Sequence, residues 1–141
     1  GADVHGKTLR GQTPLMLTAG SNARGTLDTM KFLMEVLAKT EAQDDMGWTP
    51  LLHACRNSQQ ETAALLLEKA ASVQAQAQDG KTATMLAAID GCDALVMNLL
   101  GHRAPVNAVD AEGFSVLLYA CEEGNGDLVR GLLQCRANAR A

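Results

Sequence analysis

The chain has 141 residues, of which 47% are hydrophobic and 20% charged, a composition typical of a globular domain and not of a disordered segment. Its net charge of −4 comes from 12 basic and 16 acidic residues interspersed along the chain, with no basic run that would neutralise a row of phosphates. These features argue against nucleic acid as a partner. No apolar stretch approaches the roughly 18 to 20 residues that span a bilayer, so direct membrane insertion is not expected.

The aromatic and cysteine content narrows the fold class and the compartment. Two Phe, one Trp and one Tyr are present, so the core must be built from Leu, Ala, Met and Val, which favours packed helices over a β-sandwich. The four cysteines are widely spaced and form no Cys-x-x-Cys pair, although an even number would permit two bridges. Residues 1–30 lack the layout of a signal peptide. We therefore expect an intracellular, reducing compartment, the cytoplasm first, with the nucleus or an organelle interior left open.

An internal repeat organises the chain. Gly11, Gly47, Gly80 and Gly113 are separated by 36, 33 and 33 residues. Two residues after each glycine comes a matching pair: Thr13-Pro14, Thr49-Pro50, Thr82-Ala83 and Ser115-Val116. The spacing predicts four repeats at about 11–46, 47–79, 80–112 and 113–141 in a single domain, preceded by residues 1–10 as the hairpin of an earlier repeat.

Each repeat is predicted to contain a turn, a short helix, a Gly/Asn/Ser break, a second helix and an extended segment. In the last repeat the helices are expected at 116–121 and 128–135, and residues 136–141 as the extended segment. Leucine-rich pairs beginning at Leu33, Leu66, Leu99 and Leu132 recur at a constant 33 residues, so the three extra residues of the first repeat fall within 20–25, between its helices. Neither helix is long enough to be stable alone, so stacking of repeats must bury their apolar faces.

The repeat resembles the ankyrin repeat. The motif Gly-x-Thr-Pro-Leu is complete in residues 47–55 (GWTPLLHAC), and residues 103–110 (RAPVNAVD) are a good copy of the connecting hairpin. The resemblance covers the whole chain and implies an all-α ankyrin repeat solenoid of four helix-turn-helix units joined by β-hairpin loops. Threonine as the N-cap and proline at the first helical position fit this pattern physically. The third and fourth repeats lack the proline, and we expect them to be locally softer.

Three motifs that could carry chemistry are better explained by structure. Residues 1–8 (GADVHGKT) match a phosphate-binding loop, but no strand precedes them and they align with the hairpin. A zinc site could be imagined from His53 and the cysteines, but Cys55 and Cys121 align with Ala19 and Ala88 at a small-residue core position. The last cysteine, Cys135, is expected to end the final helix. No enzyme activity, metal or cofactor is expected.

His53 and the acidic residues also have simple structural interpretations. His53 shares its position with Leu17, Leu86 and Tyr119, a semi-apolar position from which the imidazole could hydrogen-bond a neighbouring repeat. No serine or cysteine has a reason to be activated by it. The acidic residues at loop tips and helix ends, Asp44 and Asp110 among them, are expected to be solvated.

The resemblance implies a partner protein bound on the concave face. In the family, specificity lies in the hairpin tips, in the residue between Gly and Thr, and after the first helix. The tips contribute Met46, Asp79 and Glu112. The Gly-x-Thr position holds Gln12, Trp48, Lys81 and Phe114, and the positions after the first helix hold Arg56, Asn57, Asp90, Glu122 and Glu123. Of these, Trp48 and Phe114 are the expected apolar anchors. Packing of Trp48 on the next hairpin would also explain the presence of a tryptophan at this position.

The predicted function is therefore a protein-protein interaction scaffold. The acidic setting of the two aromatic residues favours a partner segment with apolar residues flanked by Lys or Arg. The alternative is a structural segment buried within a large multi-protein complex, favoured by the many alanines and the apolar ends. A catalytic function would require a domain outside residues 1–141.

Overall fold

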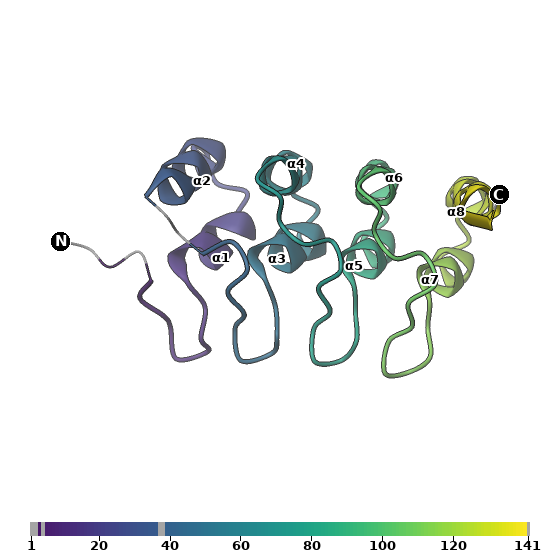
Figure 1. Cartoon of the computed structure of the whole chain (residues 1–141), viewed down its shortest axis with the longest axis horizontal. Helices are drawn as coiled ribbons and strands as arrows, with labels where there is room; N and C mark the ends of the chain where they lie inside the picture. Colours follow the sequence, from purple (N-terminus) through teal and green to yellow (C-terminus); the bar gives the residue numbers. More distant parts are fainter. Residues whose placement is uncertain (1–2, 4, 37–38, 141) are drawn as a thin grey trace.

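The computed structural model describes residues 3, 5–36 and 39–140, and these residues contain eight helices (Figure 1). Four are short first helices of the repeats, here termed inner: α1 (Pro14–Ala19), α3 (Pro50–Arg56), α5 (Ala83–Ile89) and α7 (Val116–Glu122). The other four are outer: α2 (Thr26–Glu35), α4 (Gln60–Glu68), α6 (Asp93–Gly101) and α8 (Gly126–Arg140). The alternation of short inner and outer helices confirms the predicted all-α repeat fold.

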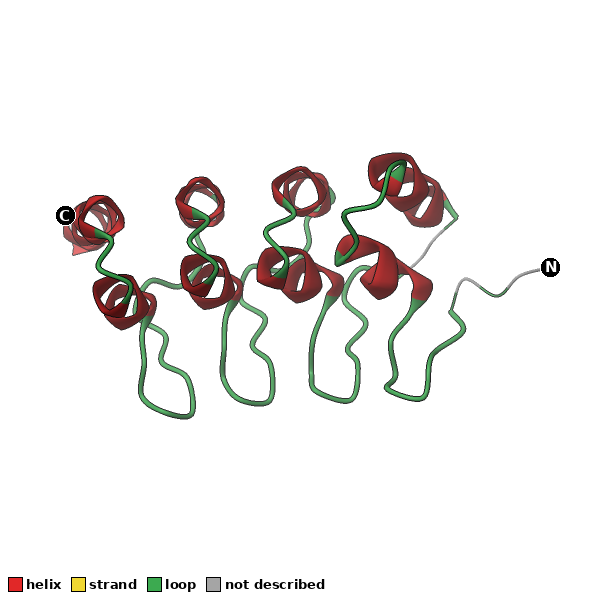
Figure 2. Ribbon diagram, turned by 180° about the vertical axis from the view of Figure 1, so that it is seen from behind, coloured by secondary structure: helices red, strands yellow, loops and turns green. Residues whose placement is uncertain are grey.

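The helices form two parallel rows. Each inner helix contacts the next inner helix, and each outer helix contacts the next outer helix. The loops between consecutive pairs all project from the same side of the array (Figures 1 and 2). We call one projecting loop with its inner and outer helix a unit, and number the units from the N-terminus. The array is extended, and each unit lies against its sequence neighbours alone, as in other solenoids.

Hydroxyl side chains begin the inner helices. The side chains of Thr13, Thr49, Thr82 and Ser115 accept hydrogen bonds from the backbone N–H of Met16, Leu52, Met85 and Leu118, at 3.3 to 3.4 Å. Each cap residue has an extended backbone, and proline follows it in units 1 and 2. Units 3 and 4 keep the cap without the proline. The predicted capping is therefore present in all four units.

Stacking of the units builds one continuous core. Equivalent leucines of the outer helices, Leu66, Leu99 and Leu132, are fully buried, and the core runs through the inner helices of every unit. The helices other than α8 have six to ten residues, too few for stability in isolation. The fold is thus held by burial between units rather than by helix propensity.

The three inserted residues of unit 1 lie where the sequence predicts. The segment between α1 and α2 spans residues 20–25, whereas the corresponding segments of units 2 to 4 are residues 57–59, 90–92 and 123–125. Gly25 ends the longer loop with a left-handed backbone (φ 81°) and has no neighbouring atom within 4 Å of an added Cβ. The insertion therefore lengthens a surface loop without disturbing the stack.

The projecting loops are hairpins, each closed by a backbone hydrogen bond such as Ala77 N–H to Lys81 C=O (3.0 Å), and among the described residues they contain one isolated antiparallel bridge, Gln76 with Thr82, and no longer strand. One expectation about extended structure is wrong. The segment from residue 136, expected to be extended, continues α8 as far as Arg140, so Cys135 does not end the helix. That segment has no Gly or Pro to interrupt a helix and contains three alanines, which favour one. Ala141 lies outside the described residues.

Candidate functional site

The projecting loops are tied to one another at their tips. Each tip turns at a glycine with a left-handed backbone, for example Gly80 (φ 81°). One backbone hydrogen bond joins each tip to the next: Asp45 N–H to Arg10 C=O (3.0 Å), Gln78 N–H to Met46 C=O (3.0 Å), and Ala111 N–H to Asp79 C=O (2.9 Å). The tips therefore form a ladder along the array, and their outward side chains occupy one continuous edge.

A buried carboxylate organises the loop of unit 2. One oxygen of Asp44 accepts hydrogen bonds from the backbone N–H of Met46 (3.0 Å) and Trp48 (2.9 Å). Its other oxygen lies 2.9 Å from Nε2 of His53 on α3. The rings of Trp48 and His53 are 5.4 Å apart and tilted. Because an ionised carboxylate only accepts hydrogen bonds, Nε2 is the donor, and the loop is fixed to the inner helix.

The same arrangement recurs in unit 4, 66 residues later. One oxygen of Asp110 accepts from the backbone N–H of Glu112 and Phe114, both at 2.9 Å, and the hydroxyl of Tyr119 donates to the other oxygen. The Phe114 and Tyr119 rings are 5.0 Å apart. Asp44 and Asp110 are thus not solvated as expected, because each carboxylate turns inward to satisfy backbone N–H groups of its own loop.

The electrostatics of Asp110 follow from these contacts. Its side chain is completely inaccessible to solvent, and burial alone would raise its pKa. The hydrogen bonds from Tyr119 and from two backbone N–H groups, with the nearby Lys81, outweigh burial and hold the pKa of Asp110 below its ordinary value. Burial and the neighbouring Asp110 raise the pKa of Tyr119. The pair is therefore a carboxylate and a neutral phenol over the physiological range.

Unit 3 has the same ladder hydrogen bonds but lacks the Asp-centred cluster. Ala77 and Leu86 stand where units 2 and 4 have the aspartate and the histidine or tyrosine. The ammonium of Lys81 lies 3.1 Å from a carboxylate oxygen of Asp79 and 3.8 Å from Asp110 of the next unit. Lys81 is consequently held between two carboxylates, and its charge is largely neutralised on this edge.

The structure places the predicted partner-binding residues along one strip. Eight of them are exposed and lie on loop tips or at the ends of inner helices: Met46, Arg56, Asn57, Asp79, Asp90, Glu112, Glu122 and Glu123. Trp48, Lys81 and Phe114 are half-buried. Trp48 packs on His53 of its own unit and against the core, while Phe114 rests on Tyr119.

His53 and Tyr119 connect the loop tips to the helix ends, and sequence reasoning did not assign them this role. The side-chain amide of Asn57 donates to the backbone carbonyl of His53 (2.9 Å), and the backbone N–H of Glu123 donates to that of Tyr119 (3.0 Å). By the predicted repeat boundaries, 11–46 and 47–79, the hydrogen bond of His53 to Asp44 joins two neighbouring repeats, as anticipated, although both residues belong to one projecting loop and its inner helix. The sequence does contain a signal for this role: Asp, an aromatic residue and His or Tyr recur at the same spacing in units 2 and 4.

The charge of the strip changes along the array. The last turn of α3 carries Arg56, whereas the last turns of α5 and α7 carry no basic residue. Exposed acids follow those helices at Asp90, Glu122 and Glu123. Acidic groups near helix C-termini are not neutralised by the helix dipole. The C-terminal half of the strip is therefore negative and has no local basic partner in the last inner turns.

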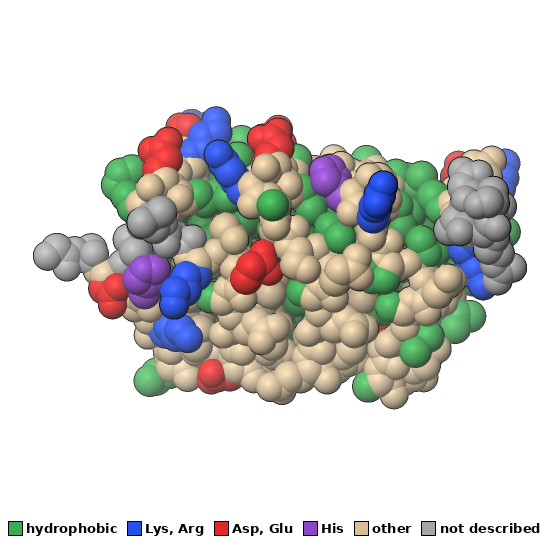
Figure 3. Space-filling model, viewed as in Figure 1, with side chains coloured by type: hydrophobic (Ala, Val, Ile, Leu, Met, Phe, Trp, Pro, Cys, Tyr) green, Lys and Arg blue, Asp and Glu red, His purple; other side chains and the backbone are tan. Residues whose placement is uncertain are grey.

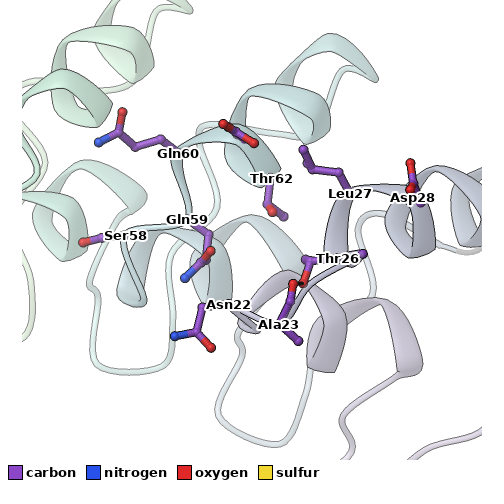
Figure 4. Close-up of a pocket in the computed structure, with 11 residues that line it drawn as sticks. Asn22, Ala23, Thr26, Leu27, Asp28, Ser58, Gln59, Gln60 and Thr62 are labelled. Atoms are coloured by element: carbon purple, nitrogen blue, oxygen red, sulfur yellow. Dashed lines mark hydrogen bonds between the residues drawn. The ribbon is translucent and has the colours of Figure 1, made fainter.

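A polar groove separates units 1 and 2 on the side of the interhelical loops (Figure 4). Its volume is about 620 Å³, and the longer loop of unit 1 forms one wall. Asn22 and Thr26 line that wall, while Ser58, Gln59 and Thr62 line the other. Every buried side-chain N or O atom of the described residues has a hydrogen-bond partner, so no unsatisfied group marks a ligand here. The sequence places the insertion but does not reveal this groove.

The cysteines differ in environment. Cys55 and Cys92 are buried, and burial raises the pKa of the Cys55 thiol. Cys121 is exposed, although its sequence position predicts core packing, because this structure has no further inner helix on that face of α7. All four cysteines are free of disulfides. No cluster of three His, Cys, Asp or Glu side chains capable of holding a metal ion occurs among the described residues.

Residues 7–13, described in full, contain no helix, so the lysine of the 1–8 motif does not open one as a phosphate-binding loop requires. Gly1, Ala2 and Val4 of that motif lie outside the described residues. Within the part of the chain that is described, no helix combines the length and apolar character needed to cross a membrane.

Comparison with known proteins agrees with the repeat geometry. The family model described as "Ankyrin repeats (3 copies)" matches residues 1–77 and again residues 70–141. No curated protein matches the sequence significantly. The two matched ranges do not place the individual repeat boundaries, which stay a prediction. They cover the chain from end to end, and the chain belongs to the ankyrin repeat family.

Proposed function

We propose that the strip of loop tips and inner-helix ends is a protein-binding surface, and that the chain acts as an interaction scaffold. Ankyrin repeats are generally protein-protein interaction modules and are typically not enzymes. The observation that carries the proposal is the pair of Asp-centred clusters, which rigidly orient Trp48 and Phe114 on the loops. A preordered surface loses little conformational entropy on binding.

This surface fits a partner segment in which apolar residues are flanked by Lys or Arg. Met46 is exposed on the tip of unit 2, and Phe114 is half-buried beside Tyr119 in unit 4. Exposed Glu112, Glu122 and Glu123 add negative charge on the loop tip and at the end of the inner helix of the same unit. Electrostatic complementarity of this kind increases association rates and specificity more than affinity.

The test selects peptides of mixed apolar and basic composition from a display library on the immobilised chain and measures their binding by fluorescence anisotropy. A Met46→Ala, Phe114→Ala double variant is expected to weaken binding about tenfold or more, since central anchors contribute most of the affinity. Trp48→Ala is a poorer probe on its own because Trp48 also packs against the core. Circular dichroism must show unchanged helix content in every variant.

Matched controls separate the strip from the rest of the surface. Met97→Ala removes an exposed methionine from the outer helix α6 and should leave affinity unchanged. Glu122→Gln with Glu123→Gln should reduce the salt dependence of binding, while Glu61→Gln with Glu68→Gln on α4 should not. Equal losses of affinity from the strip variants and the α4 variant would contradict the proposal. A loss of affinity from the α4 variant and from no strip variant would instead place the site at the polar groove, which Glu61 lines.

A second candidate function is that of a segment within a larger assembly. It is favoured by the apolar side chains exposed at the C-terminal end of the array, among them Leu118 and Leu133. In that case the strip variants would leave assembly intact. Binding that depends on Leu118 and not on Phe114 would support this second function over the first.

A further inference from the structure

The tips of the projecting loops carry charges whose sign changes along the array. The equivalent tip positions of units 1 to 4 are basic, apolar, acidic and acidic: Arg10, Met46, Asp79 and Glu112. All four residues are exposed. Lys and Arg side chains gather beside the first projecting loop (lower left of Figure 3). The row of tips is therefore positive at unit 1 and negative at units 3 and 4.

The ends of the inner helices repeat this order. Exposed Arg56 ends α3, whereas the equivalent position of unit 4 is exposed Glu122. The next position is Asn57 in unit 2, Asp90 in unit 3 and Glu123 in unit 4. Both edges of the strip thus change in the same direction, from basic residues in units 1 and 2 to acidic residues in units 3 and 4.

Most of these charges are not neutralised within the described part of the chain. Lys81 lies 3.1 Å from a carboxylate oxygen of Asp79 and offsets its charge. Asp45, exposed beside the tip of unit 2, is an acidic group within the basic half. Six residues that set the order form no ion pair with any described residue: Arg10, Arg56, Asp90, Glu112, Glu122 and Glu123. Unpaired surface charges leave their field available to a partner.

Local stability does not account for the acidic half. Asp90 and Glu123 follow the C-terminal ends of α5 and α7, where the helix dipole disfavours negative charge. Arg56 has the opposite sign at the equivalent end of α3, where the dipole favours it. The change of sign between units 2 and 3 therefore does not follow from helix capping, and a binding partner is the remaining source of a favourable interaction.

We propose that the strip binds an extended partner segment that is itself charge-polarised, with acidic residues over units 1 and 2 and basic residues over units 3 and 4. The inference rests on the proposed function, because it specifies the partner of the same surface. It also fixes the orientation of the segment. In the reverse orientation, basic residues would face Arg10 and Arg56 and acidic residues would face Glu122, and like charges across an interface oppose binding.

The spacing of the units sets the length of the segment. Packed helices lie about 8–10 Å apart, so the three intervals between four inner helices span about 24–30 Å. An extended chain rises about 3.3 Å per residue, so about seven to nine residues reach from unit 1 to unit 4. The matching segment is therefore short, with acidic residues at one end, apolar residues in the centre and basic residues at the other end.

The probe is a synthetic peptide with a glutamate pair at one end, about seven leucine and serine residues in the centre and a lysine pair at the other end. A peptide of the same composition with its charges interspersed is the matched probe. Fluorescence anisotropy with a neutral fluorophore measures both. The wild-type chain is expected to bind the polarised peptide about tenfold more tightly at low salt. This preference should disappear as salt shortens the screening length to about 3 Å at about 1 M.

A photo-crosslinker at the acidic end of the polarised peptide reports its orientation. Mass spectrometry of the wild-type complex should locate the crosslinks in units 1 and 2. A charge-swapped variant exchanges the signs of both edges through Arg10→Glu, Arg56→Glu, Glu112→Lys and Glu122→Lys. In this variant the peptide should still bind, and its crosslinks should move to units 3 and 4. Arg10→Glu with Arg56→Glu alone should weaken binding about tenfold.

Lys31→Glu with Lys69→Glu is the matched control for Arg10→Glu with Arg56→Glu. It makes the same change of net charge in the same two units, at exposed residues in and directly after the outer helices. It should leave both the affinity and the crosslinked positions unchanged. Circular dichroism and urea unfolding check the fold of each variant, and Arg10→Glu alone, on a loop tip outside any helix, replaces a pair that fails to fold.

Several outcomes would overturn the inference and separate it from the proposed function. Equal affinity for the two peptides, or wild-type crosslinks spread over both halves, would show that charge does not orient the partner. Crosslinks that stay in units 1 and 2 of the charge-swapped variant would show the same. If neither synthetic peptide binds while library peptides bind the strip, the inference fails and the proposed function stands. If library peptides fail as well, both are wrong.

Discussion

Removing the hydroxyl of Tyr119 would measure how strongly the Asp110 cluster holds the loop of unit 4. Asp110 is inaccessible to solvent and accepts three hydrogen bonds, and Tyr119→Phe removes one of them while keeping the ring beside Phe114. A hydrogen bond to a charged acceptor contributes about 1.5–3 kcal/mol. Because two backbone donors remain, we expect the free energy of unfolding to fall by about 2 kcal/mol. Urea unfolding followed by circular dichroism measures this loss.

A double-mutant cycle with Asp110→Asn isolates the pair. In the asparagine background the acceptor is neutral, so Tyr119→Phe should lower the free energy of unfolding by about 1 kcal/mol or less. Equal losses in both backgrounds, or a loss below about 0.5 kcal/mol in the native background, would refute the view that this hydrogen bond secures the loop.

The pH dependence provides a second reading of the same pair. The pKa of Asp110 is lowered in the folded chain, so its contribution to stability is complete above the unfolded pKa and is lost as the pH falls through the folded value. The pKa of Tyr119 is raised, so its contribution is present below the unfolded pKa and is lost as the pH rises through the folded value. Tyr119→Phe removes a donor from Asp110, and its acid unfolding should therefore begin at higher pH. An unchanged acid midpoint would contradict this.

Three further predictions concern other features. Gly80→Ala would place a Cβ 2.9 Å from the Cα of Asp110, whereas a Cβ at Gly113, which has a similar positive φ, meets no atom within 4 Å. In urea unfolding, Gly80→Ala should therefore lower the free energy of unfolding by about 1–3 kcal/mol more than Gly113→Ala does. Ala83 follows a cap residue whose backbone is already extended, so Ala83→Pro should raise the free energy of unfolding by about 0.4–1 kcal/mol. A lower free energy of unfolding in this variant would show that the backbone N–H of Ala83 is needed. Ellman's reagent should label Cys121 rapidly in dilute native protein and should reach buried Cys55, whose thiol pKa is raised, only on unfolding.

The candidate strip was only partly predictable. Equivalent positions in the repeat identify the loop tips and inner-helix ends because a fixed period places them at the same edge of every unit. The inward orientation of Asp44 and Asp110 was not predicted. A short acidic side chain next to a turn can either face water or accept backbone N–H groups, and the sequence does not distinguish the two unless His53 and Tyr119 are recognised as partners.

The sequence by itself determined the repeat period, the helix starts, the position of the insertion and the family, because these depend on local capping, turn glycines and apolar spacing. The tertiary structure decided the properties that depend on a neighbouring unit. The exposure of Cys121 and Leu118, the helical continuation to Arg140 and the polar groove beside the long loop all depend on whether another unit packs against a given face. Equivalent residues in a repeat share a chemical character, but their burial is set by what lies across the interface.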